Sequence, residues 1–117
     1  MMRLLHDRTG ADIATAVTLA DTRASRRRGL LGRDGMDEGE ALMLSPCAAI
    51  HTFFMRFAID VVFVRDTGEV THIAHGLRPW RIALSMRAHA VIELPAGVAL
   101  SSDTRAGDVL ELVPRTA

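Results

Sequence analysis

The chain has 117 residues and a mass of 12.7 kDa, and 49% of its residues are hydrophobic and 24% charged. This length suits one domain spanning residues 1–117, and the composition is that of a globular protein, which excludes intrinsic disorder. Fourteen arginines balance fourteen acidic residues, so the formal net charge is zero. That balance gives no strong electrostatic case for binding nucleic acid or an anionic membrane.

The cysteine content and the N-terminus indicate a compartment. Cys47 is the only cysteine, which excludes an intramolecular disulfide and a multi-cysteine zinc site and suits a reducing environment. Polar residues follow directly after Leu4 and Leu5, so the N-terminus lacks the apolar region of a signal peptide. No apolar run approaches the length of about 18 residues that spans a membrane. We therefore expect a soluble, cytoplasmic protein with no membrane span.

Short apolar or alternating segments between turn signals predict a mainly β domain. In chain order, strands are expected at residues 3–6, 14–19, 41–44, 50–54, 59–64, 70–75, 90–94 and 109–113. A short helix is expected at residues 22–31, capped by Asp21 or Thr22 and ended by Gly32. A second short helix is expected after Gly97. The clearest hairpin joins residues 59–64 to residues 70–75.

Residues 50–64 read IHTFFMRFAIDVVFV, which is too long for one straight strand, so a bend is expected at residues 55–58. In the second half, alternation places Ile59, Val61 and Phe63 on one face and Asp60, Val62 and Val64 on the other. Asp60 needs a partner among so many apolar residues, and Arg33, Arg56 and Arg81 are the expected ones. Two interpretations stay open: a buried structural ion pair, or a carboxylate of a functional site.

Several sequence blocks occur in an order that resembles one known family. They are Ala20-Asp21-Thr22, Arg28-Gly29-Leu30-Leu31-Gly32-Arg33, Ile50-His51-Thr52-Phe53-Phe54-Met55-Arg56-Phe57, Ile59-Asp60-Val61-Val62-Phe63, Pro79-Trp80, Glu93-Leu94-Pro95-Ala96-Gly97 and Gly107-Asp108. The chain resembles, over nearly its whole length, the prokaryotic family called domain of unknown function 192. The resemblance implies a small β-sandwich or partly closed barrel with one or two short helices. It implies no activity and no catalytic residues, and many members are exported.

The residue patterns for a metal site and for a cysteine nucleophile are weak. Cys47 and His51 have a C-x3-H spacing without a second pair, so no metal site and no cofactor are predicted. Cys47 also lacks the glycine elbow or helix start that would activate it as a nucleophile, and a small buried side chain is the simpler interpretation. The basic run Arg26–Arg28 is followed at once by acidic residues, which favours a solvated helix face over a nucleic-acid contact.

The function predicted from the residues is that of a non-enzymatic module that binds a small ligand or a protein partner. Its site is predicted to comprise Arg33, His51, Arg56, Asp60, Trp80 and Glu93, if these polar residues meet at one mouth of the β domain. The alternative is a small hydrolase or lyase that uses Asp60 or Glu93 with His51. No catalytic residue is assigned, and the sequence leaves the oligomeric state open.

Overall fold

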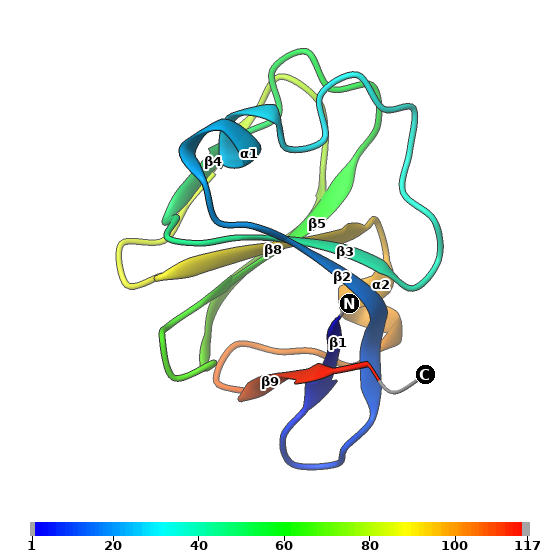
Figure 1. Ribbon diagram of the computed structural model, residues 1–117, viewed down its shortest axis with the longest axis vertical. Coiled ribbons are helices and arrows are strands. Elements are labelled where there is room, and N and C mark those ends of the chain that lie inside the picture. The colour runs from blue at the N-terminus through cyan, green and yellow to red at the C-terminus, as the bar shows by residue number, and fades with distance from the viewer. Residues whose placement is uncertain (1, 116–117) are drawn as a thin grey trace.

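A curled sheet of seven strands forms the body of the molecule, and the computed structural model describes residues 2–115 of it (Figure 1). The strands follow the spatial order β6-β5-β8-β3-β2-β1-β9. Their bounds are β1 Met2–His6, β2 Asp12–Ala20, β3 Glu40–Leu44, β5 Ile59–Val64, β6 Val70–Leu77, β8 Ala90–Pro95 and β9 Leu110–Pro114. Two short strands, β4 (Ala49–His51) and β7 (Ile82–Leu84), form a separate antiparallel pair, and the helices are α1 (Arg23–Arg28) and α2 (Val98–Ser101).

The two outer strands of the curled sheet meet at one end and partly close it into a barrel. The Val70 N–H donates to the Asp108 carbonyl at 2.8 Å, and the Leu110 N–H donates to the Gly68 carbonyl at 2.9 Å. Gly68 has a φ of +91°, and a Cβ there would collide with the Leu110 carbonyl oxygen. Glycine is therefore required at this closure for both its backbone conformation and its lack of a side chain.

Side-chain alternation in the central strands separates two apolar cores. In β5, Val62 and Val64 pack into a core inside the barrel, whereas Ile59, Val61 and Phe63 pack into a second core on the outer face of the sheet. The period of two that the sequence predicted for β5 is confirmed, as are its bounds. Leu30 and Ile50 also belong to the second core, so the α1 segment and β4 cover this outer face.

A crossover between two parallel strands places α1 over the sheet. Strands β2 and β3 pair in parallel, so residues 21–39 must travel back along the sheet between them. Thr22 caps α1 by accepting the Ser25 N–H at 3.0 Å, as the sequence predicted for one of its two candidates. The helix ends earlier than expected, at Arg28, because Gly29 adopts a φ of +44° and its N–H donates back to the Ser25 carbonyl.

The predicted fold class, a mainly β domain in a partly closed barrel with two short helices, is confirmed. The 50–54 strand is shorter than expected because β4 ends at His51, and the chain turns through residues 52–58 before β5 begins. This turn lies where the bend was expected. Strand β7 was not expected, because its three residues carry too short a pattern to be distinguished from a loop.

Candidate functional site

A pocket with a volume of about 340 Å³ lies between α1 and β4, over the second core. Its apolar wall comprises Gly29, Leu30, Leu31, Leu44, Ala49, Ile50 and Met55, and its polar lining comprises Arg26, Arg27, Arg28, Cys47, His51 and Glu93. This size lies at the lower end of the range for small-molecule sites, and a mostly apolar lining with few polar groups is typical of them. The geometry can therefore hold a compact ligand.

Glu93 enters this pocket from the sheet. Alternation in β8 sends Ile92 and Leu94 into the barrel core, so Glu93 faces the opposite side, where its cross-strand neighbours are Leu42 and Val61. Its side chain is almost completely buried, with 4% of the residue exposed. Within residues 2–115 no hydrogen bond or ion pair reaches its carboxyl group. Burial in these apolar surroundings raises the pKa of Glu93 to about 7.

Cys47 lies beside Glu93 in the same pocket. Its Sγ donates to the Ala49 carbonyl oxygen at 3.1 Å. Burial raises the pKa of the Cys47 thiol, and the nearby negative charge of Glu93 raises it further. The thiol is therefore held protonated, which is the opposite of what a cysteine nucleophile needs.

Hydrogen bonds from Arg26 hold α1 beside the pocket. Its guanidinium donates to the Asp21 carbonyl at 3.0 Å and to the Ser45 carbonyl at 3.3 Å, so it joins the crossover to the loop that precedes β4. Arg27 and Arg28 are exposed at the edge of the pocket. The positive charge of this run therefore borders a cavity, which the sequence interpretation of a solvated helix face did not anticipate.

Asp60 is buried, but the prediction that an arginine is its partner is wrong. Its carboxylate accepts three backbone N–H groups, from Gly76 at 2.8 Å, Gly97 at 3.0 Å and Ala99 at 2.9 Å. Asp60 shares the barrel face of β5 with Val62, and α2 begins directly above this position. Backbone donors from a β6 glycine and the start of α2 thus take the place of a cation. The side chain joins three segments and is not among the pocket-lining residues.

The other predicted site residues are distributed over several surfaces. Arg33 makes a bidentate pair with Glu40, at 2.6 and 2.7 Å, which raises the pKa of Arg33 and lowers that of Glu40. Arg56 pairs with the exposed Asp34 at 2.8 Å. Trp80 is exposed and contacts aromatic rings outside the pocket. Of the six predicted residues, His51 and Glu93 line the pocket and the other four do not.

Thr52 is a buried polar residue that the sequence reasoning missed. Its N–H donates to the Arg81 carbonyl and its hydroxyl to the Arg78 carbonyl, at 2.9 and 2.6 Å, and its carbonyl accepts the Trp80 N–H at 3.0 Å. It thereby fixes the 78–81 turn against the turn that follows β4. A threonine between His51 and Phe53 gives no periodic signal, so only the three-dimensional contacts identify it.

Among residues 2–115, no group of three or more His, Cys, Asp and Glu side chains is close enough to hold a metal ion. No helix in this range is long and apolar enough to cross a membrane.

Comparison with sequence relatives confirms the family resemblance. The model of the family called domain of unknown function 192, described as "Uncharacterized ACR", matches residues 5–112. A UPF0127 protein of Thermococcus sibiricus is 33% identical over 100 residues, which is 81% of this chain and 64% of that protein. A UPF0127 protein of Pyrococcus furiosus is 38% identical over 65 residues, which is 55% of each chain. The matched region therefore covers less than two thirds of the length of these relatives.

Two solved structures have the same fold at low sequence identity. A Novosphingobium aromaticivorans protein of unknown function has a TM-score of 0.81 at 21% identity, covering 94% of this chain and 82% of that one. A Sinorhizobium meliloti protein, described provisionally as a transcription regulator, has a TM-score of 0.82 at 23% identity, covering 94% of this chain and 90% of that one. At these identities the likeness shows the fold alone.

Proposed function

We propose that this chain, which belongs to the family called domain of unknown function 192, is a small-ligand-binding module. Its ligand enters the pocket between α1 and β4. The observation that carries the proposal is the buried, unpartnered carboxyl group of Glu93 at the pocket lining. An ionisable side chain in apolar surroundings costs free energy unless a partner satisfies it. A bound ligand can supply that partner.

The lining indicates what the ligand must offer. Its body is apolar, to pack against Leu30, Leu44 and Ile50, and one polar group forms a hydrogen bond with Glu93. With a pKa of about 7, this carboxyl group can donate as an acid or accept as a carboxylate near neutral pH. The direction of the pH dependence of affinity therefore identifies the ligand group: affinity for an amine rises with pH, and affinity for a carbonyl or carboxylate falls.

A thermal-shift screen tests this function. Small amines, carboxylic acids, sugars and nucleotides are each added at high concentration, since a ligand at 100 times its Kd adds about 2.7 kcal/mol of stability. For each ligand that raises the melting temperature, the shift is measured again in Glu93→Gln and in Glu111→Gln, an exposed strand glutamate that serves as the control. The proposal expects the shift to shrink only in Glu93→Gln. Shifts that are equal in both variants place the ligand elsewhere and contradict it.

The alternative, a small hydrolase or lyase, is favoured by one observation: Glu93 and His51 line the same pocket, and a carboxyl pKa of about 7 suits a general acid or base. Asp60 contributes nothing to this alternative, since its oxygens are bonded to backbone N–H groups outside the pocket. Activity against model esters, glycosides, peptides or phosphates that disappears in both Glu93→Gln and His51→Ala would support catalysis. Inactivity of the wild-type chain on all four classes would contradict it.

A further inference from the structure

We propose that a second surface docks the chain onto an anionic lipid bilayer. This surface, which we call the apolar ridge, comprises Phe54, Trp80, Ile82, Leu84 and Met86. It extends from the turn after β4, through the 78–81 turn and β7, into the following loop. The ridge lies outside the pocket lining, so the proposal is independent of the ligand-binding function.

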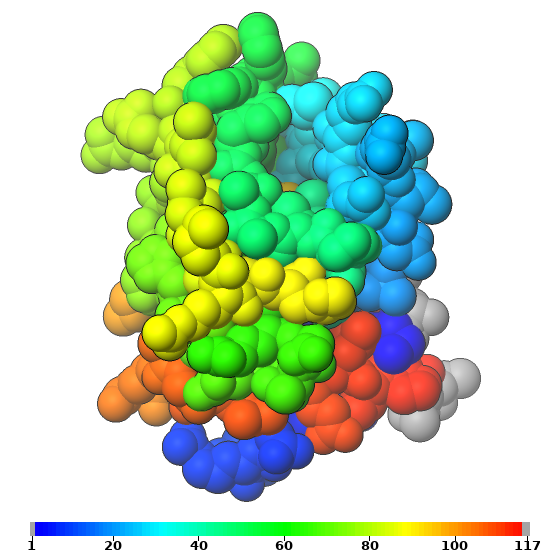
Figure 2. Space-filling model, turned by 90° about the vertical axis from the view of Figure 1, so that its left-hand side faces the viewer, coloured from blue at the N-terminus to red at the C-terminus, as the bar shows by residue number. Residues whose placement is uncertain are grey.

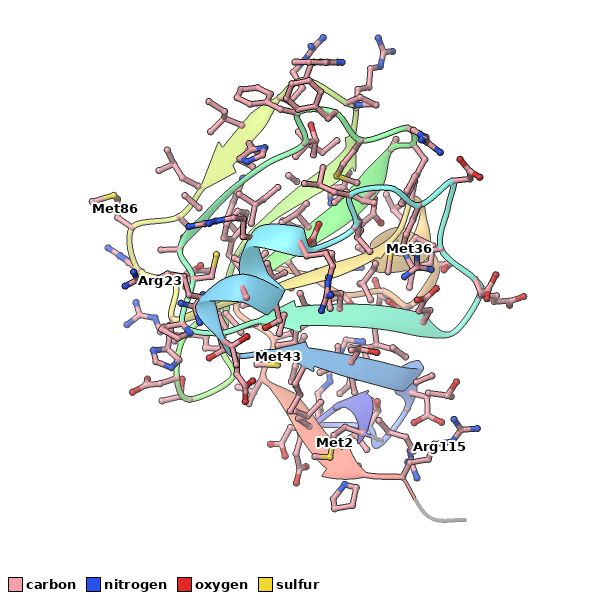
Figure 3. All side chains as sticks on the ribbon, turned by 45° about the horizontal axis from the view of Figure 1, so that its top comes forward. Met2, Arg23, Met36, Met43, Met86 and Arg115 are labelled. Carbon is pink, nitrogen blue, oxygen red and sulfur yellow. The ribbon has the colours of Figure 1, made fainter. Side chains whose placement is uncertain are left out.

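All five side chains of the ridge project into solvent. Phe54 is 71% exposed, Trp80 55%, Ile82 63%, Leu84 54% and Met86 89%. The segment that carries four of them runs along the face presented in Figure 2, coloured yellow-green to yellow. Met86 points away from the body of the molecule in Figure 3. Single exposed apolar residues are ordinary, but a contiguous group of large ones marks an interaction surface.

The aromatic part of the ridge is fixed in place. Phe54 and Trp80 both have a φ of +67°, a backbone conformation that residues with side chains seldom adopt. Their rings lie 4.6 Å apart between centroids, and Phe53 stacks on Trp80 at 5.7 Å. The hydrogen bonds of Thr52 join the turn after β4, which carries Phe54, to the 78–81 turn, which carries Trp80. The exposed aromatic side chains are thus a preorganised group rather than a loose loop.

The charge around the ridge is uneven, although the net charge of the chain is zero. Residues 41–59 and 70–92 contain no aspartate or glutamate, and they carry Arg56, Arg78, Arg81 and Arg87. All four arginines are exposed. Within residues 2–115, only Arg56 of these four forms a salt bridge with an acidic side chain. The ridge is therefore an apolar strip bordered by positive charge, and its complement is an apolar layer beneath negative charge.

An anionic bilayer meets both requirements better than other occupants. Aromatic and aliphatic side chains enter the boundary between headgroups and acyl chains, and arginines contact anionic headgroups. A second copy of this chain would place like charges against each other. Single-stranded nucleic acid would need open ring faces for base stacking, whereas Phe53 and Phe54 already contact the Trp80 ring.

The wild-type chain provides its own reporter, because Trp80 is the only tryptophan. Vesicles of phosphatidylcholine, alone or with half phosphatidylglycerol, are added at low salt, and tryptophan emission and co-sedimentation are measured. The proposal expects a blue shift and sedimentation with the anionic vesicles only, both weakened by high salt. An unchanged emission with no sedimentation at low salt would overturn it. Binding of a single-stranded oligonucleotide or a polyglutamate peptide, without vesicle binding, would overturn it as well.

Variants separate insertion from simple charge attraction. Arg78→Gln and Arg87→Gln are each expected to weaken partitioning about fivefold, the effect of one arginine near an anionic surface. Met86→Ser is expected to weaken it as well, whereas Leu100→Ser, an equally apolar exposed site on α2, is expected to leave it unchanged. Equal binding by Met86→Ser and wild type would overturn the role of the ridge. All these sites are exposed, and unaltered melting temperatures confirm that the variants fold.

Discussion

Replacing Glu93 by Gln tests the central electrostatic feature of the site. The substitution keeps the size of the side chain and removes its ionisation. A carboxyl pKa that changes from its ordinary value of 4.5 to about 7 on folding corresponds to about 3 kcal/mol. The side chain is almost fully buried, so little of this free energy is lost to screening by solvent.

The sign of the pH dependence follows from proton binding. Between pH 4.5 and about 7 the folded chain retains a proton on Glu93 that the unfolded chain has released. The free energy of unfolding of the wild type therefore falls as the pH rises through this window, and this contribution is constant above it. In Glu93→Gln that fall is absent. Relative to wild type, the variant should therefore gain about 3 kcal/mol between pH 4 and pH 8.

Urea denaturation at a series of pH values measures this difference directly. For a chain of this length, about 3 kcal/mol also corresponds to about 12 °C in melting temperature. Glu111→Gln, on an exposed strand position, serves as the matched control and should follow the wild-type curve. A difference between Glu93→Gln and wild type that does not vary with pH would refute the reasoning, because it would show that the carboxyl group titrates equally in both states.

Three further substitutions test the structural roles assigned above, each by urea denaturation. Asp60→Asn should lower the free energy of unfolding by about 3 kcal/mol or more, since it replaces charge-assisted bonds to three backbone N–H groups; a loss below about 1 kcal/mol would contradict this role. Gly68→Ala should lower the free energy of unfolding by more than about 2 kcal/mol, because its Cβ would collide with the Leu110 carbonyl. Gly10→Ala, at a similar φ in open space, should lower it by about 1 kcal/mol. Equal losses would argue against the close contact between Gly68 and Leu110. Thr52→Val should cost about 2 kcal/mol and change the emission of Trp80, and unchanged emission would show that the hydroxyl does not hold that turn.

Local pattern was sufficient to predict most of the strands. The strict alternation of residues 59–64 predicted both the bounds of β5 and the face of each side chain, because the period of a strand is fixed by its backbone geometry. Pattern was insufficient where a contact joins distant segments. The partners of Asp60 are backbone N–H groups 16 to 39 residues away, which are invisible to a search for charged side chains.

The candidate site was only partly predictable for the same reason. Glu93 attracted attention as an acid in an apolar strand, and the structure places it in the pocket with His51. The other lining residues come largely from the α1 segment, residues 26–31. Their position over the sheet depends on the path of the crossover, and no spacing in the sequence encodes which face of the sheet that path covers.

The parallel pairing of β2 and β3 has a consequence for how this fold can vary. The returning segment, residues 21–39, cannot be shortened to a tight turn, so any chain with this topology must keep a long connection there. The same connection provides Arg26, Arg27 and Leu30 to the pocket, while Glu93 is fixed in the sheet. If the pocket binds a ligand as proposed, insertions or substitutions in this connection can alter which ligand is accepted and leave strand pairing intact. Chains that share the sheet can thus differ in the lining of this pocket through one segment.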